Sequence, residues 1–278
     1  MRRDVRAGRL VRVHRGVYRT QTDDALSELM AAYVHLGPEA VACLRSGADL
    51  HGVQGIVGDH VPEFALPPGT ERAQREGMRL HFWDLSDEDV VVVHGIPTTS
   101  LHATLADLAR LLPRQQAVAC LDSALHQGLM TLPELKALGS RMRRRPHAVA
   151  GRRRLAEARV GAASPLETRV RLRAEDGGFP PDELQVPIRD DSGHLLGYAD
   201  AGYRLPDGGW LLVEADGRTI HEAPTALMHD RHRQNALLAQ PGTSMVRFTW
   251  ADTQSPGYIP SVLRPILTRH GWRPPRRP

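Results

Sequence analysis

The sequence predicts an α/β protein, and three features carry this prediction. Two apolar runs, residues 197–203 and 210–217, flank a Pro-Asp-Gly-Gly turn and therefore indicate a β-hairpin. Leucines recur at helical spacing through residues 99–112, as in an amphipathic helix. From residue 159 onward the expected elements follow the order helix, three strands, helix, strand. With 278 residues the chain is long enough for two domains.

The composition is that of a folded, arginine-rich chain. It is 41% hydrophobic and 24% charged with a formal net charge of +4, and Lys136 is its single lysine. Arginine suits bidentate contacts to phosphate and guanine, although GC-rich coding gives the same bias. No apolar run reaches the roughly 20 residues that cross a bilayer, and the Arg-rich N-terminus lacks the apolar core of a secretory signal. Cys43 and Cys120 have no paired spacing, so we expect reduced thiols in a cytoplasmic protein without a membrane partner.

Residues 1–22 predict part of a winged helix-turn-helix domain. Residues 2–7 are expected to end a recognition helix, with Gly8 as its terminator. Residues 10–14 alternate apolar and basic side chains like a strand of the wing, before a turn and a second short strand. The alternative is a basic ribbon that packs on the next domain.

Residues 23–140 predict a compact α/β region. Helices are expected at residues 23–36, 38–50 and 99–112, and after a cap at Thr131, with strands at residues 63–66, 80–83 and 90–94. The histidines of this region lack the spacing of a metal-binding motif such as HExxH.

Residues 141–158 are expected to form an Arg-rich linker. Seven arginines fall within residues 141–154. Such a concentration of positive charge predicts a patch that contacts phosphates, and the alternative is a solvated linker. The candidate phosphate-binding residues are Arg143, Arg144, Arg145, Arg152 and Arg153.

Residues 159–278 carry the candidate chemistry. Ser164, a proline and Glu167 are typical of a helix start. Strands at residues 183–188, 196–204 and 210–216 precede a helix at 225–239, a strand at 244–250 and a helix at 259–269. A doubly wound nucleotide-binding fold would need a Gly-rich first turn, which the sequence lacks. We therefore expect no nucleotide cofactor.

The hairpin is expected to bring acidic side chains together. If it is centred on Asp207, residues whose numbers add up to 414 face each other, so Asp200 faces Glu214, and Asp216 lies on the same face as Glu214. Opposed carboxylates repel, and a hard divalent cation would remove this penalty. The alternatives are a solvated hairpin end or a register slip that separates the acids.

Two segments in the first half of the chain resemble AbiEi-type antitoxin regulators of type IV toxin–antitoxin systems. The basic residues 1–20 are similar to the end of the N-terminal domain of these regulators. The phrase at residues 95–109, Gly-Ile-Pro-Thr-Thr-Ser-Leu-His-Ala-Thr-Leu-Ala-Asp-Leu-Ala, is similar to the segment that follows it. The resemblance implies a double-stranded DNA partner and a toxin or defence-system partner.

Residues 160–252 resemble the bacterial family of unknown function related to very-short-patch-repair (Vsr-like) endonucleases. The motifs are Ser164-Pro-Leu-Glu167, Asp200, Val213-Glu-Ala-Asp-Gly217, His221, Asp230-Arg-His-Arg-Gln-Asn235 and Val246-Arg-Phe-Thr-Trp250. The resemblance implies a restriction-endonuclease-like αβββαβ core of the PD-(D/E)XK type, whose element order matches the one expected here.

The same resemblance implies roles for individual residues. Asp200 and Glu214 would hold Mg²⁺, which lowers the pKa of an attacking water. Asp216 and His221 would occupy positions that the repair enzymes fill with histidines, and Glu167 would be the helix acid near the metal. Arg231 and Arg233 would neutralise charge on the phosphorane.

Several of these residues have a structural alternative. Glu167 also fits a capping role, and Arg231 and Arg233 could pair with Asp216 or Glu214. The usual motif places a lysine where this chain has Asp216. The sequence thus predicts an Mg²⁺-dependent DNA endonuclease of repair or phage defence. The alternatives are an inactive DNA-binding regulator of a toxin–antitoxin or defence system, and a protein–protein module of such a system.

Overall fold

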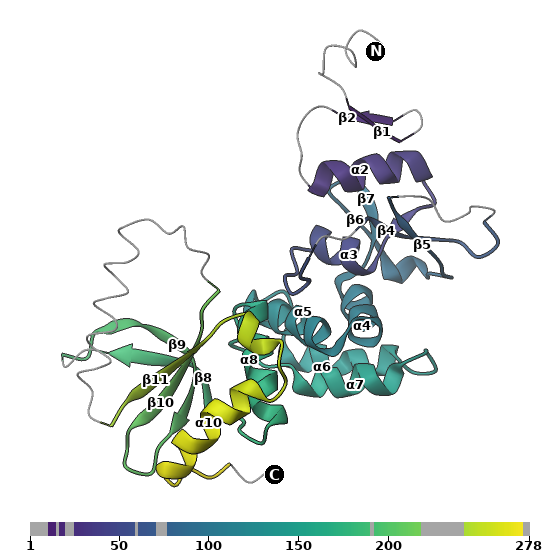
Figure 1. The fold of residues 1–278 in the computed structure, drawn as a ribbon. Helices are drawn as coiled ribbons and strands as arrows, with labels where there is room; N and C mark the ends of the chain where they lie inside the picture. Colours follow the sequence, from purple (N-terminus) through teal and green to yellow (C-terminus); the bar gives the residue numbers. More distant parts are fainter. Residues whose placement is uncertain are drawn as a thin grey trace. The chain divides into compact units, whose positions relative to one another are not determined.

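A computed structural model describes residues 11–14, 17–19, 25–58, 61–70, 77–189, 192–217 and 242–274 of the chain (Figure 1). The protein is an α/β protein, as predicted. It divides into two compact units, Met1–Ala158 and Arg159–Pro278, which are described separately.

Unit 1 begins with a short antiparallel strand pair and continues as a sheet with helices. In the pair, Arg12 lies opposite Tyr18, as expected for two strands joined by a tight turn; the predicted recognition helix lies outside the described residues. The strands of unit 1 are β1 (Val11–His14), β2 (Val17–Arg19), β3 (Val41–Ala42), β4 (Glu63–Leu66), β5 (Arg79–Phe82), β6 (Val90–Val93) and β7 (Ile96–Thr99). Its helices are α2 (Ala25–Leu36), α3 (Leu44–Leu50), the 3₁₀ turn η1 (Asp87–Asp89), α4 (Leu101–Leu111), α5 (Arg114–His126), α6 (Leu132–Arg141) and α7 (Ala148–Glu157).

The five-stranded sheet of unit 1 has the order β5-β4-β3-β7-β6. The pairs β4–β5 and β3–β7 are parallel, whereas β3–β4 and β6–β7 are antiparallel. Helix α2 packs Leu29 and Leu36 into a core with Phe64, Leu80 and Ile96 of the strands. This burial of one apolar helix face against a sheet is what holds the layer together.

Helices α3 to α7 share a second core. Leu105 and Leu108 of α4 are fully buried there, together with Leu121 of α5, Leu135 of α6 and Leu155 of α7. The capping box predicted at Thr131 is present, since its side chain accepts from the Glu134 amide and the Glu134 carboxylate accepts from the Thr131 amide.

Two expectations for unit 1 were wrong, and two elements were missed. Residues 38–50 do not form one helix, because residues 41–42 pair with β4 and β7 before α3 begins. Helix α5 and strand β7 were not predicted. Residues 141–158 are not a linker throughout, since α7 buries Gly151 and Leu155 against the second core.

Unit 2 contains a four-stranded sheet of order β11-β10-β9-β8. β8–β9 and β9–β10 are antiparallel, while β10–β11 is parallel. The order of the described elements agrees with the prediction; the helix expected at residues 225–239 lies outside them. The elements are α8 (Pro165–Asp176), β8 (Glu183–Arg189), β9 (Leu195–Arg204), β10 (Trp210–Ala215), β11 (Ser244–Phe248), the 3₁₀ turn η2 (Ala251–Thr253) and α10 (Tyr258–Arg269).

One face of this sheet carries the core of unit 2. Tyr203, Leu211 and Phe248 of the strands pack there with Leu166 of α8 and Leu263 of α10. Tyr203 also donates its hydroxyl to the Phe179 carbonyl at 2.8 Å, and burial raises the pKa of this phenol. The opposite face holds a smaller cluster with Val186, Ile188, Ala199 and Leu212.

The predicted hairpin is confirmed in register. Trp210 lies opposite Arg204 and Val213 opposite Ala201, which is the pairing that a turn centred on Asp207 requires. Gly208 has a φ of 87° in this turn, a conformation that glycine adopts without steric cost. In the described part of the chain, no helix combines the length and apolarity needed to cross a membrane.

Candidate nucleic-acid interface and acidic strand site

The arginines of residues 141–154 divide into two groups by their contacts. Three of them make contacts within unit 1: Arg141 pairs with Asp89, Arg145 lies 3.4 Å from Asp107, and Arg154 donates to the Ala109 carbonyl at 2.7 Å. The other four are exposed, as are Arg141 and Arg145, and they form no ion pair with any residue that the structure describes. These four residues are Arg143, Arg144, Arg152 and Arg153.

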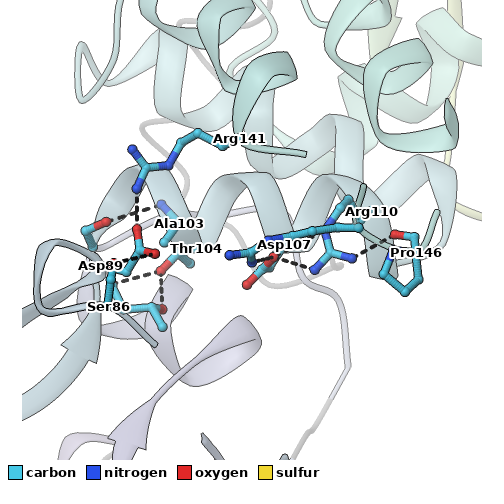
Figure 2. A network of polar contacts seen from close by, with 11 residues as sticks. Ser86, Asp89, Ala103, Thr104, Asp107, Arg110, Arg141 and Pro146 are labelled. Atoms are coloured by element: carbon cyan, nitrogen blue, oxygen red, sulfur yellow. Dashed lines mark hydrogen bonds and ion pairs between the residues drawn. The ribbon is translucent and has the colours of Figure 1, made fainter. Parts of the chain in front are cut away.

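A buried ion pair on α4 anchors this segment. Arg110 donates from Nη2 to Asp107 Oδ1 at 2.6 Å, from Nε to the same oxygen at 3.2 Å, and from Nη1 to the Pro146 carbonyl at 2.8 Å. Figure 2 shows Arg110 between Asp107 and Pro146. The Asp107 and Arg110 side chains are only 3% and 6% exposed, so this pair is screened little by salt. It ties the backbone of the arginine-rich loop, residues 142–147 between α6 and α7, to the interior of unit 1.

A second polar cluster fixes the end of α6. Ser86 donates to Asp89 Oδ2 at 3.1 Å, and Arg141 contacts the other carboxylate oxygen, as Figure 2 shows. Because Asp89 ends η1 and Arg141 ends α6, the contact joins two elements that are distant in sequence. The loop that follows Arg141 is thereby held at both ends.

That loop has an unusual backbone. Arg144 and His147 both have φ of 61°, a left-handed conformation that costs energy for residues other than glycine and concentrates at functional positions. His147 precedes the first turn of α7 and makes no capping hydrogen bond with its side chain. The exposed arginines are therefore presented from a defined loop and helix start.

Sequence reasoning missed Asp107 and Arg110. The one available signal was a charged pair at helical spacing inside the strongly apolar residues 99–112. It also missed Glu63, which is 2% exposed, forms an ion pair with Arg45 whose Nε lies 3.3 Å away, and contacts His81 Nε2 at 3.0 Å. A single acid in an apolar strand gives no indication of such partners.

The two thiols of unit 1 are not reactive nucleophiles. Both side chains are fully buried. Burial raises the pKa of Cys43 well above its usual range, and burial raises the pKa of Cys120 to about 12. A thiolate is the reactive form, so both groups behave as small apolar residues at neutral pH.

In unit 2, Asp200 lies where β9 and β10 separate. Its Oδ2 accepts the Ala215 amide at 2.7 Å, and Ala215 lies two residues beyond Val213, the last residue of β10 that pairs with β9. Asp200 also lines a small cavity with Glu167 of α8. The structure thus brings these two predicted site residues to one cavity.

Glu214 points elsewhere. Its neighbours Val213 and Ala215 line the cavity with Asp200, and alternation along the strand places Glu214 on the other face, with Leu212. There Glu214 is 8% exposed and lies 3.3 Å from Arg247 Nε, its register partner on β11. Asp200 and Glu214 are therefore not brought to one face.

The remaining predicted site residues are partly described. Glu167 Oε2 accepts the Ala163 amide at 2.8 Å and the Gln185 side chain at 3.2 Å, and the Glu167 amide donates to Ser164 at 3.2 Å. Glu167 is thus part of the helix start that the sequence predicts. Asp216 follows β10 and donates its amide to the Phe248 carbonyl at 2.8 Å. His221, Arg231 and Arg233 lie outside the described residues.

The described residues do not assemble a donor set for Mg²⁺. A hard cation needs several oxygen ligands on one site. No group of three or more His, Cys, Asp or Glu side chains suited to a metal occurs among the residues that the structure describes. The two carboxylates that sequence analysis assigned to the ion occupy different faces of the sheet, so the metal site stays a prediction.

A comparison with known protein families assigns part of the chain to a class of protein. Residues 40–172 match the family model of the AbiEi antitoxin C-terminal domain, so the AbiEi resemblance is confirmed for this part of the chain. The relation to Vsr-like endonucleases stays a prediction.

Two relatives match the chain over nearly its whole length. Uncharacterized protein Rv2248 of Mycobacterium tuberculosis (strain ATCC 25618 / H37Rv) is 31% identical over 268 residues, which cover 95% of each chain. Uncharacterized protein MT2308 of Mycobacterium tuberculosis (strain CDC 1551 / Oshkosh) has the same identity and coverage. The chain belongs to the family of these mycobacterial proteins.

Proposed function

We propose that the protein is a DNA-binding regulator of a toxin–antitoxin or defence system. The observation that carries this proposal is the match of residues 40–172 to the AbiEi antitoxin C-terminal domain. Four exposed arginines without ion pairs in the described structure lie in the same region, and arginine binds DNA phosphates through counterion release. The strand pair β1–β2 supports the proposal, because a two-stranded wing is what residues 1–22 predict.

A binding experiment tests this function. The full chain is titrated into a labelled duplex taken from the region upstream of its own coding sequence, and into a scrambled duplex of equal length. We expect saturable binding that weakens with salt and favours the upstream duplex. Absence of binding, or equal affinity for both duplexes, would contradict a sequence-reading regulator.

The proposed partner is a toxin of the same system. The family match supports an antitoxin role. Co-expression of this chain with the product of the adjacent gene is expected to relieve growth arrest caused by that product alone. Continued arrest with both proteins present would remove the antitoxin part of the proposal and leave DNA binding to be judged by the titration.

Metal-dependent hydrolysis of DNA is a second candidate function. It is favoured by Asp200 and Glu167, which line one cavity in the unit that resembles Vsr-like endonucleases. The placement of Glu214 on the other face weighs against a shared Mg²⁺ ion, so this function ranks below the regulator.

Cleavage of plasmid or mismatched duplex with and without Mg²⁺ tests the second candidate. If the chain is a nuclease, cleavage requires Mg²⁺ and disappears in Asp200→Ala. The matched control Glu39→Ala removes an exposed acid of unit 1 and should cleave normally. Cleavage that survives Asp200→Ala would exclude the assigned site.

A further inference from the structure

A groove of about 490 Å³ opens in unit 1, between the end of β5 and the loop before α7. Phe82 at the end of β5 and Trp83 and Leu85 of the segment after it contribute to its lining, and α4 and the loop contribute Arg110, Arg145 and His147. Small-molecule sites typically measure about 300–1,000 Å³ and combine an apolar lining with a few polar groups. The groove has this size and this composition.

The apolar part of the groove offers flat aromatic surface. The Phe82 side chain is 42% exposed although it lies on a strand. Trp83 packs partly against the second core, and its ring centroid lies 4.8 Å from that of His81. An exposed aromatic ring beside a fixed one suits a planar ligand, because stacking needs only a π-face.

The polar part of the groove is positively charged. The Arg145 side chain is 43% exposed. The described contacts of Arg110 occupy one N–H on each of its three nitrogens, which leaves two of its five donors for another acceptor. Arg143 and Arg144 add two exposed charges on the same loop. The first turn of α7, directly after His147, adds the positive end of a helix dipole.

The loop is held in place before any ligand arrives. Arg144 and His147 keep left-handed backbone conformations, and the buried Asp107–Arg110 pair holds Arg145 and the Pro146 carbonyl. Strain that a buried network maintains is characteristic of preorganised ligand sites. The arrangement therefore fits a ligand that is both planar and anionic.

We propose that this groove binds a nucleotide unit. The base lies against Phe82 and Trp83, and the phosphate is bound by Arg145 with help from Arg110 and the loop. Asp84, a carboxylate in the lining, accepts a hydrogen bond from a ribose hydroxyl or a base amino group. This mode differs from the Gly-rich turn of doubly wound folds, which the sequence lacks. The nucleotide unit comes from a free nucleotide or from an unpaired stretch of a nucleic-acid strand.

Calorimetry on the full chain tests the proposal with three probes. ATP represents the free nucleotide, a short oligodeoxyadenylate, whose bases carry an amino group, represents the single strand, and a Glu-Phe repeat peptide represents an acidic protein segment. The variants are Phe82→Ser, which removes an exposed ring without opening the core, and Arg145→Gln. Lys136→Gln is the matched control, because it removes an exposed positive charge of α6 that does not line the groove.

We expect saturable binding of ATP, of the oligonucleotide, or of both, and the probe that binds identifies the source. Phe82→Ser and Arg145→Gln should each weaken it about tenfold or more, as loss of a stacking or charge-assisted contact does, whereas Lys136→Gln should change it less than about twofold. Binding of the peptide alone, binding of no probe, or equal loss in all three variants would overturn the proposal. Melting temperatures of the variants separate lost binding from lost folding. Because these probes contain no duplex, failure here leaves the proposed regulator function untouched.

Discussion

Asp107 and Arg110 lie on the same face of α4, three residues apart, and form a buried ion pair whose Nη2–Oδ1 distance is 2.6 Å. Asp107 Oδ1 also lies 3.4 Å from Arg145 Nη1, and Arg110 also donates to the Pro146 carbonyl. A buried pair is seldom a net gain over well-packed apolar residues. Its value here is to hold one loop in one conformation.

Breaking this pair should destabilise unit 1 strongly. Asp107→Ala leaves the Arg110 charge buried without its carboxylate, and we expect the free energy of unfolding to fall by about 3–5 kcal/mol. Urea denaturation followed by circular dichroism measures the loss. The double variant Asp107→Leu, Arg110→Met should recover most of it, because neither charge is then buried. A double variant as unstable as the single one would show that the pair is a net source of stability.

The N-cap of α8 should contribute a modest amount to stability. Ser164 accepts the Glu167 amide at 3.2 Å, so Ser164→Ala is expected to lower the free energy of unfolding by about 1 kcal/mol. Thermal unfolding monitored by the tryptophans of unit 2 reports the change. Ser164→Asp, which can replace the cap, should restore stability; if it does not, the hydroxyl acts in another way.

The exposed arginines of α7 should set the salt dependence of DNA binding. Replacing Arg152 and Arg153 by glutamine removes two phosphate contacts, and the slope of log K against log salt concentration should fall in magnitude by about 1.8. Titrations of duplex DNA at several salt concentrations measure the slope. Arg114→Gln is a control, because Arg114 is engaged with Glu157 at 2.9 Å. An unchanged slope in the double variant would place the interface elsewhere.

Stability should decline at alkaline pH through the buried thiols. Burial raises the pKa of Cys120 from its ordinary value of 9.0 to about 12. Between these values the unfolded chain loses the proton and the folded chain keeps it, so ionisation favours unfolding as pH rises. Urea midpoints at rising pH should fall across this window, and less so in Cys120→Ala. At neutral pH a thiol reagent should label the folded protein only after denaturation, and rapid labelling would contradict the burial.

Much of unit 2 could be predicted from local sequence. The turn at residues 205–209 fixes the hairpin because Pro206 and two glycines suit the turn, and side-chain alternation then sets the register that the structure confirms. The start of α8 follows from Ser164 in the same way, since a cap is a local hydrogen bond. In unit 1, α5 was missed because it is buried over much of its surface and gives weak periodicity.

The arrangement of the acids could not be predicted from alternation alone. The register passes from Leu184–Ala201 to Val186–Ala199, and Gln185 between them has a φ of 52°. As a result Ala201 and Ala199 belong to opposite faces although they are two positions apart and would share a face in a regular strand. Asp200 sits at this irregularity and accepts the Ala215 amide instead of facing Glu214.

The sequence by itself determined the α/β class, the hairpin register, the helix caps and the concentration of arginine, because each depends on neighbours along the chain. Only the tertiary structure decided which arginines are engaged in contacts within unit 1 and which form no ion pair with a described residue, and on which face each acid lies. Those outcomes depend on long-range packing: Arg110 meets Pro146 and Arg141 meets Asp89 only once the helices of unit 1 are assembled.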